Sequence, residues 1–119
     1  MSQQSAFDLD REAALDRVGG DLELLQEVAA LFLEEYPVLL SHIRQAINAN
    51  DPLALEHSAH SLKGSVGNFG AKSAHEAAFQ LELAGKTRDL ARAPERLRKL
   101  ESSLDNLRVA LVNLCEEQA

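Results

Sequence analysis

The sequence predicts an all-α protein, namely an antiparallel up-and-down four-helix bundle preceded by one short helix. Apolar residues recur at intervals of three or four along most of the chain, which is the period of an amphipathic helix. No segment alternates apolar and polar residues as a half-buried strand would. The chain has 119 residues with only six glycines and three prolines, so we expect short connections between helices. We therefore expect a single domain over residues 1–119, with an ordered core from about residue 7 to residue 116.

The first two predicted helices are delimited by capping and breaking residues. A short helix over residues 10–18 ends at a pair of glycines. A long helix follows over residues 21–48, with Asp21 as its N-cap. Its apolar stripe consists of Leu22, Leu25, Val28, Phe32, Tyr36, Leu39, Ile43 and Ile47. Because Pro37 lies inside this stripe, we expect a kink or a break there.

Three further helices complete the predicted bundle. Asp51 is an N-cap and Pro52 the first helical residue of a helix that runs to about residue 67. After a short turn, a fourth helix covers residues 72–84 and is closed by Gly85. The last helix carries leucines at alternating spacings of three and four, which form a seam suited to packing along a bundle. These are Leu97, Leu100, Leu104, Leu107, Leu111 and Leu114.

Composition and charge exclude several classes of protein. The formal net charge of −7 argues against a nucleic-acid binder, which needs a basic surface. The single cysteine, Cys115, allows neither an intramolecular disulfide nor a cysteine-based zinc site. No apolar run is long enough to span a membrane, and the first residues lack the pattern of a signal peptide. A Walker loop is absent, which disfavours a self-contained kinase. We expect a cytoplasmic, monomeric protein that binds neither nucleic acid nor membrane and needs no cofactor of its own.

The main functional signal in the sequence is a histidine on the exposed face of the helix that starts at Asp51. On a helical wheel, the side opposite His60 carries Leu55, Leu62, Val66 and Phe69. His60 therefore points to solvent, with Lys63, Gly64 and Gly67 on its own side. A neutral imidazole is a nucleophile, and a neighbouring lysine would stabilise an anion placed on the ring. Glycine in a helix costs up to about 1 kcal/mol relative to alanine, but it opens the surface to a large partner.

These residues match a known motif. The segment His60-Ser-Leu-Lys63-Gly64-Ser-Val-Gly-Asn-Phe-Gly70-Ala resembles the phosphohistidine motif of histidine-containing phosphotransfer (HPt) domains, and is similar to the phosphotransfer domain of chemotaxis histidine kinases. The resemblance extends over nearly the whole chain. It implies a four-helix bundle in which His60 is the phosphoacceptor, Lys63 the charge partner and Gly64 the residue that clears the approach. Glu82 stands where some members place a Gln or Glu that hydrogen-bonds the histidine.

The resemblance implies a phosphoryl carrier of a two-component phosphorelay rather than an enzyme with a free small-molecule substrate. His60 would accept a phosphoryl group from an aspartate of one response-regulator receiver domain and pass it to another. The partners would be receiver domains and a histidine kinase, and the magnesium would sit in the receiver. Two alternatives remain open: direct phosphorylation by a chemotaxis-type kinase, and a helical adaptor that binds signalling proteins without transfer.

The other histidines are expected to play no part in transfer. His57 flanks the same face as His60, but it lacks a lysine and a glycine one turn along, so we interpret it as a spectator. His57 and His60 together with Glu56 could hold a metal, but Lys63 opposes a cation and no further ligand is evident. The surface positions His42 and His75 are interpreted as boundary or solvated residues.

Three further features have two interpretations each. Glu82 is either a solvated helix glutamate or a residue that orients His60. Phe79, on the same flank, either covers the edge of the core or lines a partner-docking surface. A basic run is expected to be a solvated loop and helix start rather than an anion-binding patch: Lys86, Arg88, Arg92, Arg96, Arg98 and Lys99. Because an anion must approach His60, we expect carboxylates to concentrate elsewhere, with Lys63 as the main charge beside it.

Overall fold

The structure is a computed structural model that describes residues 8–118, and in this part of the chain it contains five helices and no strand. The helices are α2 (Arg11–Arg17), α3 (Leu22–Asn48), α4 (Pro52–Gly67), α5 (Lys72–Thr87) and α6 (Ala93–Cys115). The prediction of an all-α protein is confirmed. Phe7, where the predicted ordered core begins, lies outside the described residues.

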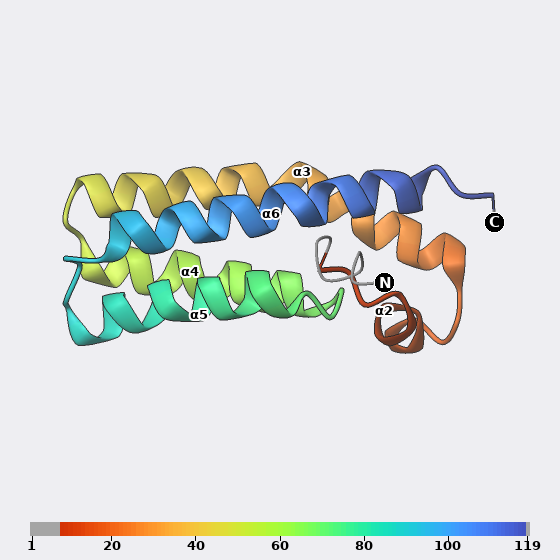
Figure 1. Ribbon diagram of the computed structural model, residues 1–119, viewed down its shortest axis with the longest axis horizontal. Helices are drawn as coiled ribbons and strands as arrows, with labels where there is room; N and C mark the ends of the chain where they lie inside the picture. The colour runs from red at the N-terminus through yellow and green to blue at the C-terminus, as the bar shows by residue number, and fades with distance from the viewer. Residues whose placement is uncertain (1–7, 119) are drawn as a thin grey trace.

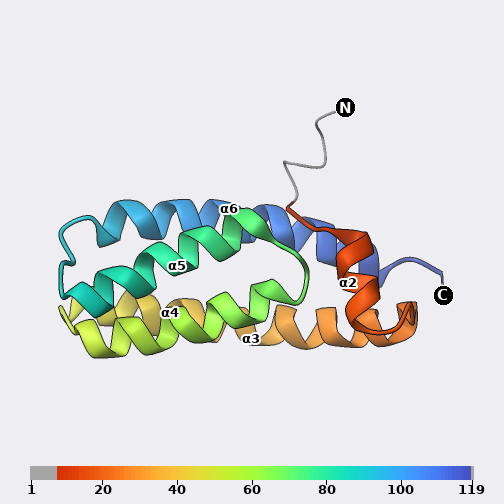
Figure 2. The same ribbon diagram turned by 90° about the horizontal axis from the view of Figure 1, so that it is seen from below.

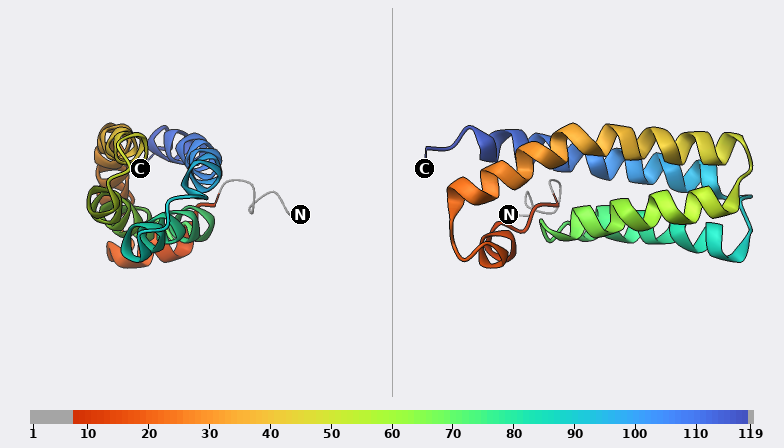
Figure 3. Two further views of the ribbon diagram at one scale, coloured as in Figure 1. Left: turned by 90° about the vertical axis from the view of Figure 1, so that its left-hand side faces the viewer. Right: turned by 180° about the vertical axis from the view of Figure 1, so that it is seen from behind.

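Each of the four long helices packs against two of the others. α3 contacts α4 and α6, and α5 contacts the same two helices from the other side. Seen from the end, the four helices surround a common centre, and each runs opposite to the one before it along the chain (Figures 1 and 3). The start of α3 and the end of α6 extend beyond α4 and α5, and α2 lies at that end of the molecule (Figure 2). His60 is therefore carried by a helix with one side on the core and the other free.

The core is built mainly from leucine and alanine, with a small aromatic cluster. The Phe32 ring stacks on Tyr36 with centroids 5.2 Å apart and meets the edge of Phe69 at 5.3 Å. Five of the six leucines of the predicted seam on α6 are fully buried: Leu100, Leu104, Leu107, Leu111 and Leu114. The wheel-predicted inner face of α4 is confirmed, since Leu55, Leu62, Val66 and Phe69 are each 0% exposed.

Aspartates begin three of the helices. The side chains of Asp10, Asp21 and Asp51 each accept a hydrogen bond from the backbone N–H three residues on, at 3.1 Å. Such a cap satisfies a donor that the first turn of a helix leaves free. The predicted caps at Asp21 and Asp51 are confirmed, and Pro52 occupies the first turn of α4 as expected.

α3 continues through Pro37 without a break. Proline removes one backbone hydrogen bond and crowds the preceding turn, so a bend is the milder consequence. The amino-terminal part of α3 is inclined relative to the rest of the helix (Figure 3). Of the two outcomes expected at Pro37, the break is wrong.

Gly85 does not close α5, as the sequence suggested, because the helix continues to Thr87. A Cβ atom at Gly85 would lie 2.6 Å from the carbonyl oxygen of Pro52 and 2.7 Å from the backbone nitrogen of Glu56. A side chain at this position would collide with the backbone of α4, so the close packing of α5 on α4 requires glycine here. The helix ends instead at Arg88, which adopts a left-handed conformation with φ of 60°.

The start of α5 is capped from a distance. Its own N-cap residue, Ala71, provides no side-chain hydrogen bond. The carboxylate of Asp8 accepts instead from the backbone N–H of Ser73 at 2.8 Å and of Ala74 at 2.9 Å. The chain before α2 is thus fastened to the helix that carries Glu82.

We predict that Asp8→Ala destabilises the protein by about 1 kcal/mol, because it removes the acceptor for two free N–H groups and a negative charge at a helix N-terminus. Chemical denaturation followed by circular dichroism measures the change. Asp16→Ala is the control, since this exposed carboxylate on α2 caps no helix and its loss should leave stability nearly unchanged. Equal effects of the two variants would contradict the distant cap.

Candidate functional site

The candidate site lies on the outer side of α4, at His60. The His60 side chain is 65% exposed, and its Nδ1 atom lies 2.8 Å from Oε2 of Glu82 on α5. The two residues are 22 positions apart in sequence and meet because α4 and α5 pack side by side. Of the two interpretations of Glu82, the solvated glutamate is therefore wrong.

Glu82 is the one buried charged residue among residues 8–118, and it is only 4% exposed. Its second oxygen, Oε1, lies 2.7 Å from the Lys63 ammonium, although this oxygen makes no well-aligned hydrogen bond among the described residues. We therefore regard the Lys63 contact as mainly ionic. Burial alone would raise the pKa of Glu82, but the contacts with Lys63 and His60 outweigh it and hold the pKa below its usual value. Glu82 is thus a carboxylate at neutral pH.

An ionised Glu82 determines which nitrogen of His60 carries the proton. A carboxylate can only accept hydrogen bonds, so Nδ1 must be the donor in the contact with Oε2. In the neutral imidazole this leaves Nε2 without a proton and with a free lone pair. Since the ring is mostly exposed, Nε2 is available to an electrophile brought by another molecule.

Lys63 is held close to Glu82 rather than extended into solvent. Its side chain is only 22% exposed, and its Nζ atom lies 5.2 Å from the centre of the Phe79 ring. A cation at that distance from an aromatic face is attracted by the ring. Phe79 is half-buried, so it covers Lys63 at the edge of the core. Its role in docking a partner stays a prediction.

The glycines of the motif differ in whether the fold of this chain requires them. A Cβ atom at Gly64 or Gly67 would meet nothing within 4 Å, so packing inside this chain requires neither. Gly70 has a φ of +60°, and a Cβ there would lie 2.6 Å from that of Asp10. Gly70 is thus required by the turn between α4 and α5. Gly64 and Gly67 leave open space on the side of α4 that carries His60.

A shallow depression of about 390 Å³ surrounds His60 and includes residues that sequence reasoning had not assigned to the site. It is lined by Glu56, His57, His60, Ser61, Glu82 and Lys86. We expected carboxylates to concentrate elsewhere, with Lys63 as the main charge beside His60; two carboxylates, Glu56 and Glu82, nevertheless border the depression, as does a second lysine, Lys86. Lys86 had been placed in a solvated basic run. Its spacing in the sequence could have assigned it to the site, because Lys86 lies four residues after Glu82 and hence on the same side of α5.

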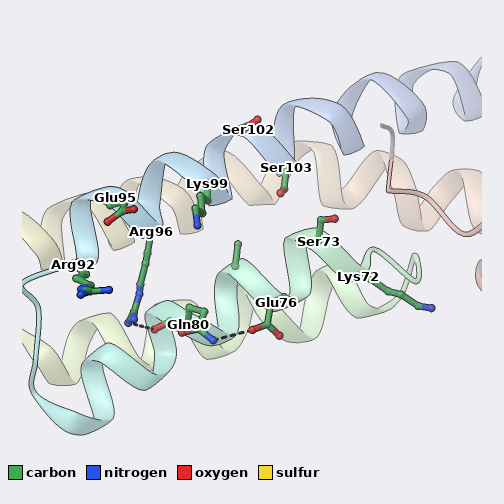
Figure 4. A pocket seen from close by; sticks show the side chains of 11 residues that line it. Lys72, Ser73, Glu76, Gln80, Arg92, Glu95, Arg96, Lys99, Ser102 and Ser103 are labelled. Atoms are coloured by element: carbon green, nitrogen blue, oxygen red, sulfur yellow. Dashed lines mark hydrogen bonds between the residues drawn. The ribbon is translucent and has the colours of Figure 1, made fainter. Parts of the chain in front are cut away.

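A second hollow, with a volume of about 800 Å³, lies between α5 and α6 (Figure 4). Arg92, Arg96 and Lys99 reach it from α6 and its start, and Glu76 and Gln80 face them from α5 (Figure 4). No histidine lines this groove. Of the six residues in the predicted basic run, Lys86 lies beside His60 and three others line this groove.

The remaining histidines are surface residues. His42, His57 and His75 are exposed, as expected. Within residues 8–118, no group of three or more His, Cys, Asp or Glu side chains is arranged to hold a metal ion. None of the five described helices is both long enough and apolar enough to cross a membrane.

Comparisons with known proteins identify a family and a solved structure with the same fold. The family model described as Hpt domain matches residues 27–110. The crystal structure of histidine-containing phosphotransfer protein B (HptB) from Pseudomonas aeruginosa PAO1 superposes with a TM-score of 0.87 and 23% sequence identity, covering 94% of this chain and 97% of that chain. At this identity the likeness shows the fold. No curated protein was found to match the chain.

Proposed function

This chain belongs to the Hpt domain family, and from that premise we propose that it carries a phosphoryl group on His60 between receiver domains of a cytoplasmic two-component phosphorelay. The four long helices would serve as an antiparallel up-and-down bundle that holds α4 rigidly. His60 would be the phosphoacceptor, Glu82 its positioning residue, and Gly64 the residue that admits the partner.

The observation that carries the proposal is the contact between His60 Nδ1 and the buried Glu82 carboxylate at 2.8 Å. It leaves Nε2 as the exposed nucleophile. It also places a negative charge beside the ring, which gains positive charge when Nε2 forms a bond. Lys63 offsets the charge of Glu82 in the resting protein, so that the carboxylate can remain buried and ionised.

In the proposed step, the Nε2 lone pair attacks the phosphorus of an aspartyl phosphate on a receiver domain. The N–P bond forms while the P–O bond to the aspartate breaks, and the aspartate leaves as a carboxylate. The proton on Nδ1 stays hydrogen-bonded to Glu82 throughout. Attack by the aspartate of a second receiver reverses these bond changes and frees His60. The magnesium that assists the aspartate would belong to the receiver, and this chain would supply no cofactor.

The surface around His60 suits a protein partner. Leu53 lies seven residues before His60, hence on the same side of α4, and it is 61% exposed. Gly64 and Gly67 continue this side without side chains. An exposed leucine, a nucleophile and an open stretch of helix together offer a docking face for a receiver.

The proposal is tested by incubating the purified chain with a phosphorylated receiver domain, in parallel with a histidine kinase and ATP. We expect transfer from the receiver, giving an acid-labile phosphoryl group on the chain. Phosphorylation by the kinase and not by any receiver would favour the chemotaxis-type alternative. Stable binding without uptake of phosphate would favour an adaptor.

We predict that Gly64→Gln stabilises the helix by up to about 1 kcal/mol through helix propensity alone, yet slows transfer. The new side chain would stand one turn from His60, in space that is otherwise open. Stopped-flow transfer and thermal unfolding measure the two effects. Gly64→Ala is the control, because it gains helix propensity with little bulk. A glutamine variant that transfers as fast as the alanine variant would contradict the steric role.

A further inference from the structure

A phosphoryl group on His60 adds roughly two negative charges to a surface that already holds carboxylates. Glu56 and Glu82 both border the depression at His60. The transferred group therefore needs a cation close to Nε2, on the solvent side of the ring. The depression at His60 has two lysines near it, Lys63 and Lys86.

Lys63 is already engaged. Its ammonium lies 2.7 Å from Glu82 Oε1, its side chain is only 22% exposed, and the Phe79 ring covers it at 5.2 Å. Turning Lys63 toward a phosphoryl group would leave the Glu82 carboxylate buried without its counter-charge, which is costly. Lys63 also does not line the depression around His60.

Lys86 is free to act. It lines the depression together with His60, its side chain is exposed, and it makes no ion pair within the described part of the chain. It lies in the last turn of α5, one turn beyond Glu82. Residues four apart are neighbours on a helix surface, so Lys86 stands beside the residue that holds His60. Its long, flexible side chain can follow a group that arrives and leaves.

We propose that Lys86 binds the phosphoryl group carried on Nε2 of His60, while Lys63 keeps the Glu82 carboxylate neutralised. This inference rests on the proposed function and names a phosphate-binding residue for it. The two lysines then have separate tasks. Lys63 acts through Glu82 on the ring, and Lys86 acts on the transferred group itself.

The test compares wild type with Lys86→Gln, Lys63→Gln and the control Lys72→Gln. Lys72 is also an exposed lysine of α5, but it lies about 21 Å from Lys86 along the helix at 1.5 Å per residue. Each protein is phosphorylated with phosphoramidate, a small phosphoryl donor. The pKa of the phosphoryl group is then followed by 31P NMR, and transfer from a phosphorylated receiver is timed at low and high salt.

Lys86→Gln should raise the pKa of the phosphoryl group, because a nearby cation favours the dianion. It should also slow transfer roughly two- to fivefold at low salt and less at high salt, as expected for an exposed charge. Lys63→Gln should lower the unfolding free energy and shift the phosphoryl pKa less. Lys72→Gln should match wild type in every measurement.

Three results would overturn the inference, and they are distinguishable from one another. If wild type takes up phosphate on His60 but Lys86→Gln has the same phosphoryl pKa and transfer rate, Lys86 has no role and the proposed function stands. If wild type takes up no phosphate from either donor, the proposed function fails and Lys86 has nothing to bind. A larger pKa shift in Lys63→Gln than in Lys86→Gln would assign the phosphoryl group to Lys63 and contradict the inference.

Discussion

The His60→Gln variant is expected to fold like the parent chain and to take up no phosphoryl group. The His60 side chain is 65% exposed and lies opposite the buried face of α4, so the substitution leaves the core unchanged. Glutamine can still donate a hydrogen bond toward Glu82, but its amide nitrogen has no free lone pair for attack on phosphorus. The loss of transfer should be complete within detection, because no second nucleophile holds the same position.

His57→Gln is the matched control for this experiment. His57 lines the same depression and is exposed, but the structure gives its ring no hydrogen bond to a carboxylate among residues 8–118. Both variants would be incubated with a phosphorylated receiver and assayed for acid-labile phosphate, with thermal unfolding recorded for each. Uptake by His60→Gln, or its loss in His57→Gln alone, would show that the nucleophile is assigned to the wrong residue.

Much of the fold follows from local pattern. The end of α2 was predicted from a pair of glycines, and the starts of α3 and α4 from the aspartate caps Asp21 and Asp51. Such signals act within one or two turns of the chain, so the sequence alone reveals them. The role of Gly85 was predicted wrongly, because it depends on a contact between two helices rather than on local sequence. Its surroundings are Pro52 and Glu56 of another helix, and no local pattern distinguishes a glycine that ends a helix from one that admits a neighbour.

In the site, too, some features follow from local sequence and others from contacts between helices. The exposed face with His60, Lys63 and Gly64 can be read from one helix, because the wheel needs only the sequence of α4. The partners from α5 depend on how the two helices are placed along one another. The close crossing at Gly85 fixes that placement and brings Glu82, three residues earlier, to the level of His60. A sequence resemblance suggested Glu82, but its burial and its pairing with Lys63 required the structure.

Glu82→Gln is expected to lower the transfer rate about ten- to a hundredfold, since a hydrogen bond to a charged group is worth roughly 1.5–3 kcal/mol. Glutamine has the size of glutamate but cannot serve both neighbours. If its carbonyl oxygen accepts from Nδ1 of His60, its NH₂ group faces the Lys63 ammonium. If the amide turns over, the NH₂ group donates to Nδ1, and the proton moves to Nε2, where it blocks attack.

The control for this substitution is Glu76→Gln, an exposed glutamate on the same helix that contacts Gln80 rather than His60. It should transfer at the wild-type rate. A rate for Glu82→Gln within twofold of wild type would contradict the positioning role. Both variants are compared at a temperature at which circular dichroism shows them folded, so unfolding does not account for a lower rate.

The charge of Glu82 also makes stability depend on pH in a defined direction. Its pKa is lower in the folded chain than its ordinary value of about 4.3, so folding favours the ionised form. The resulting stabilisation is fully present above that ordinary value and is lost as the pH falls through the lower folded-state pKa. Glu82→Gln lacks this contribution at every pH. The difference in unfolding free energy between wild type and Glu82→Gln should therefore be largest near neutral pH and shrink on acidification below about 4.3. Denaturation of both proteins between neutral and acidic pH measures it, and a difference that stays constant would mean that Glu82 is not the ionised partner of Lys63 and His60.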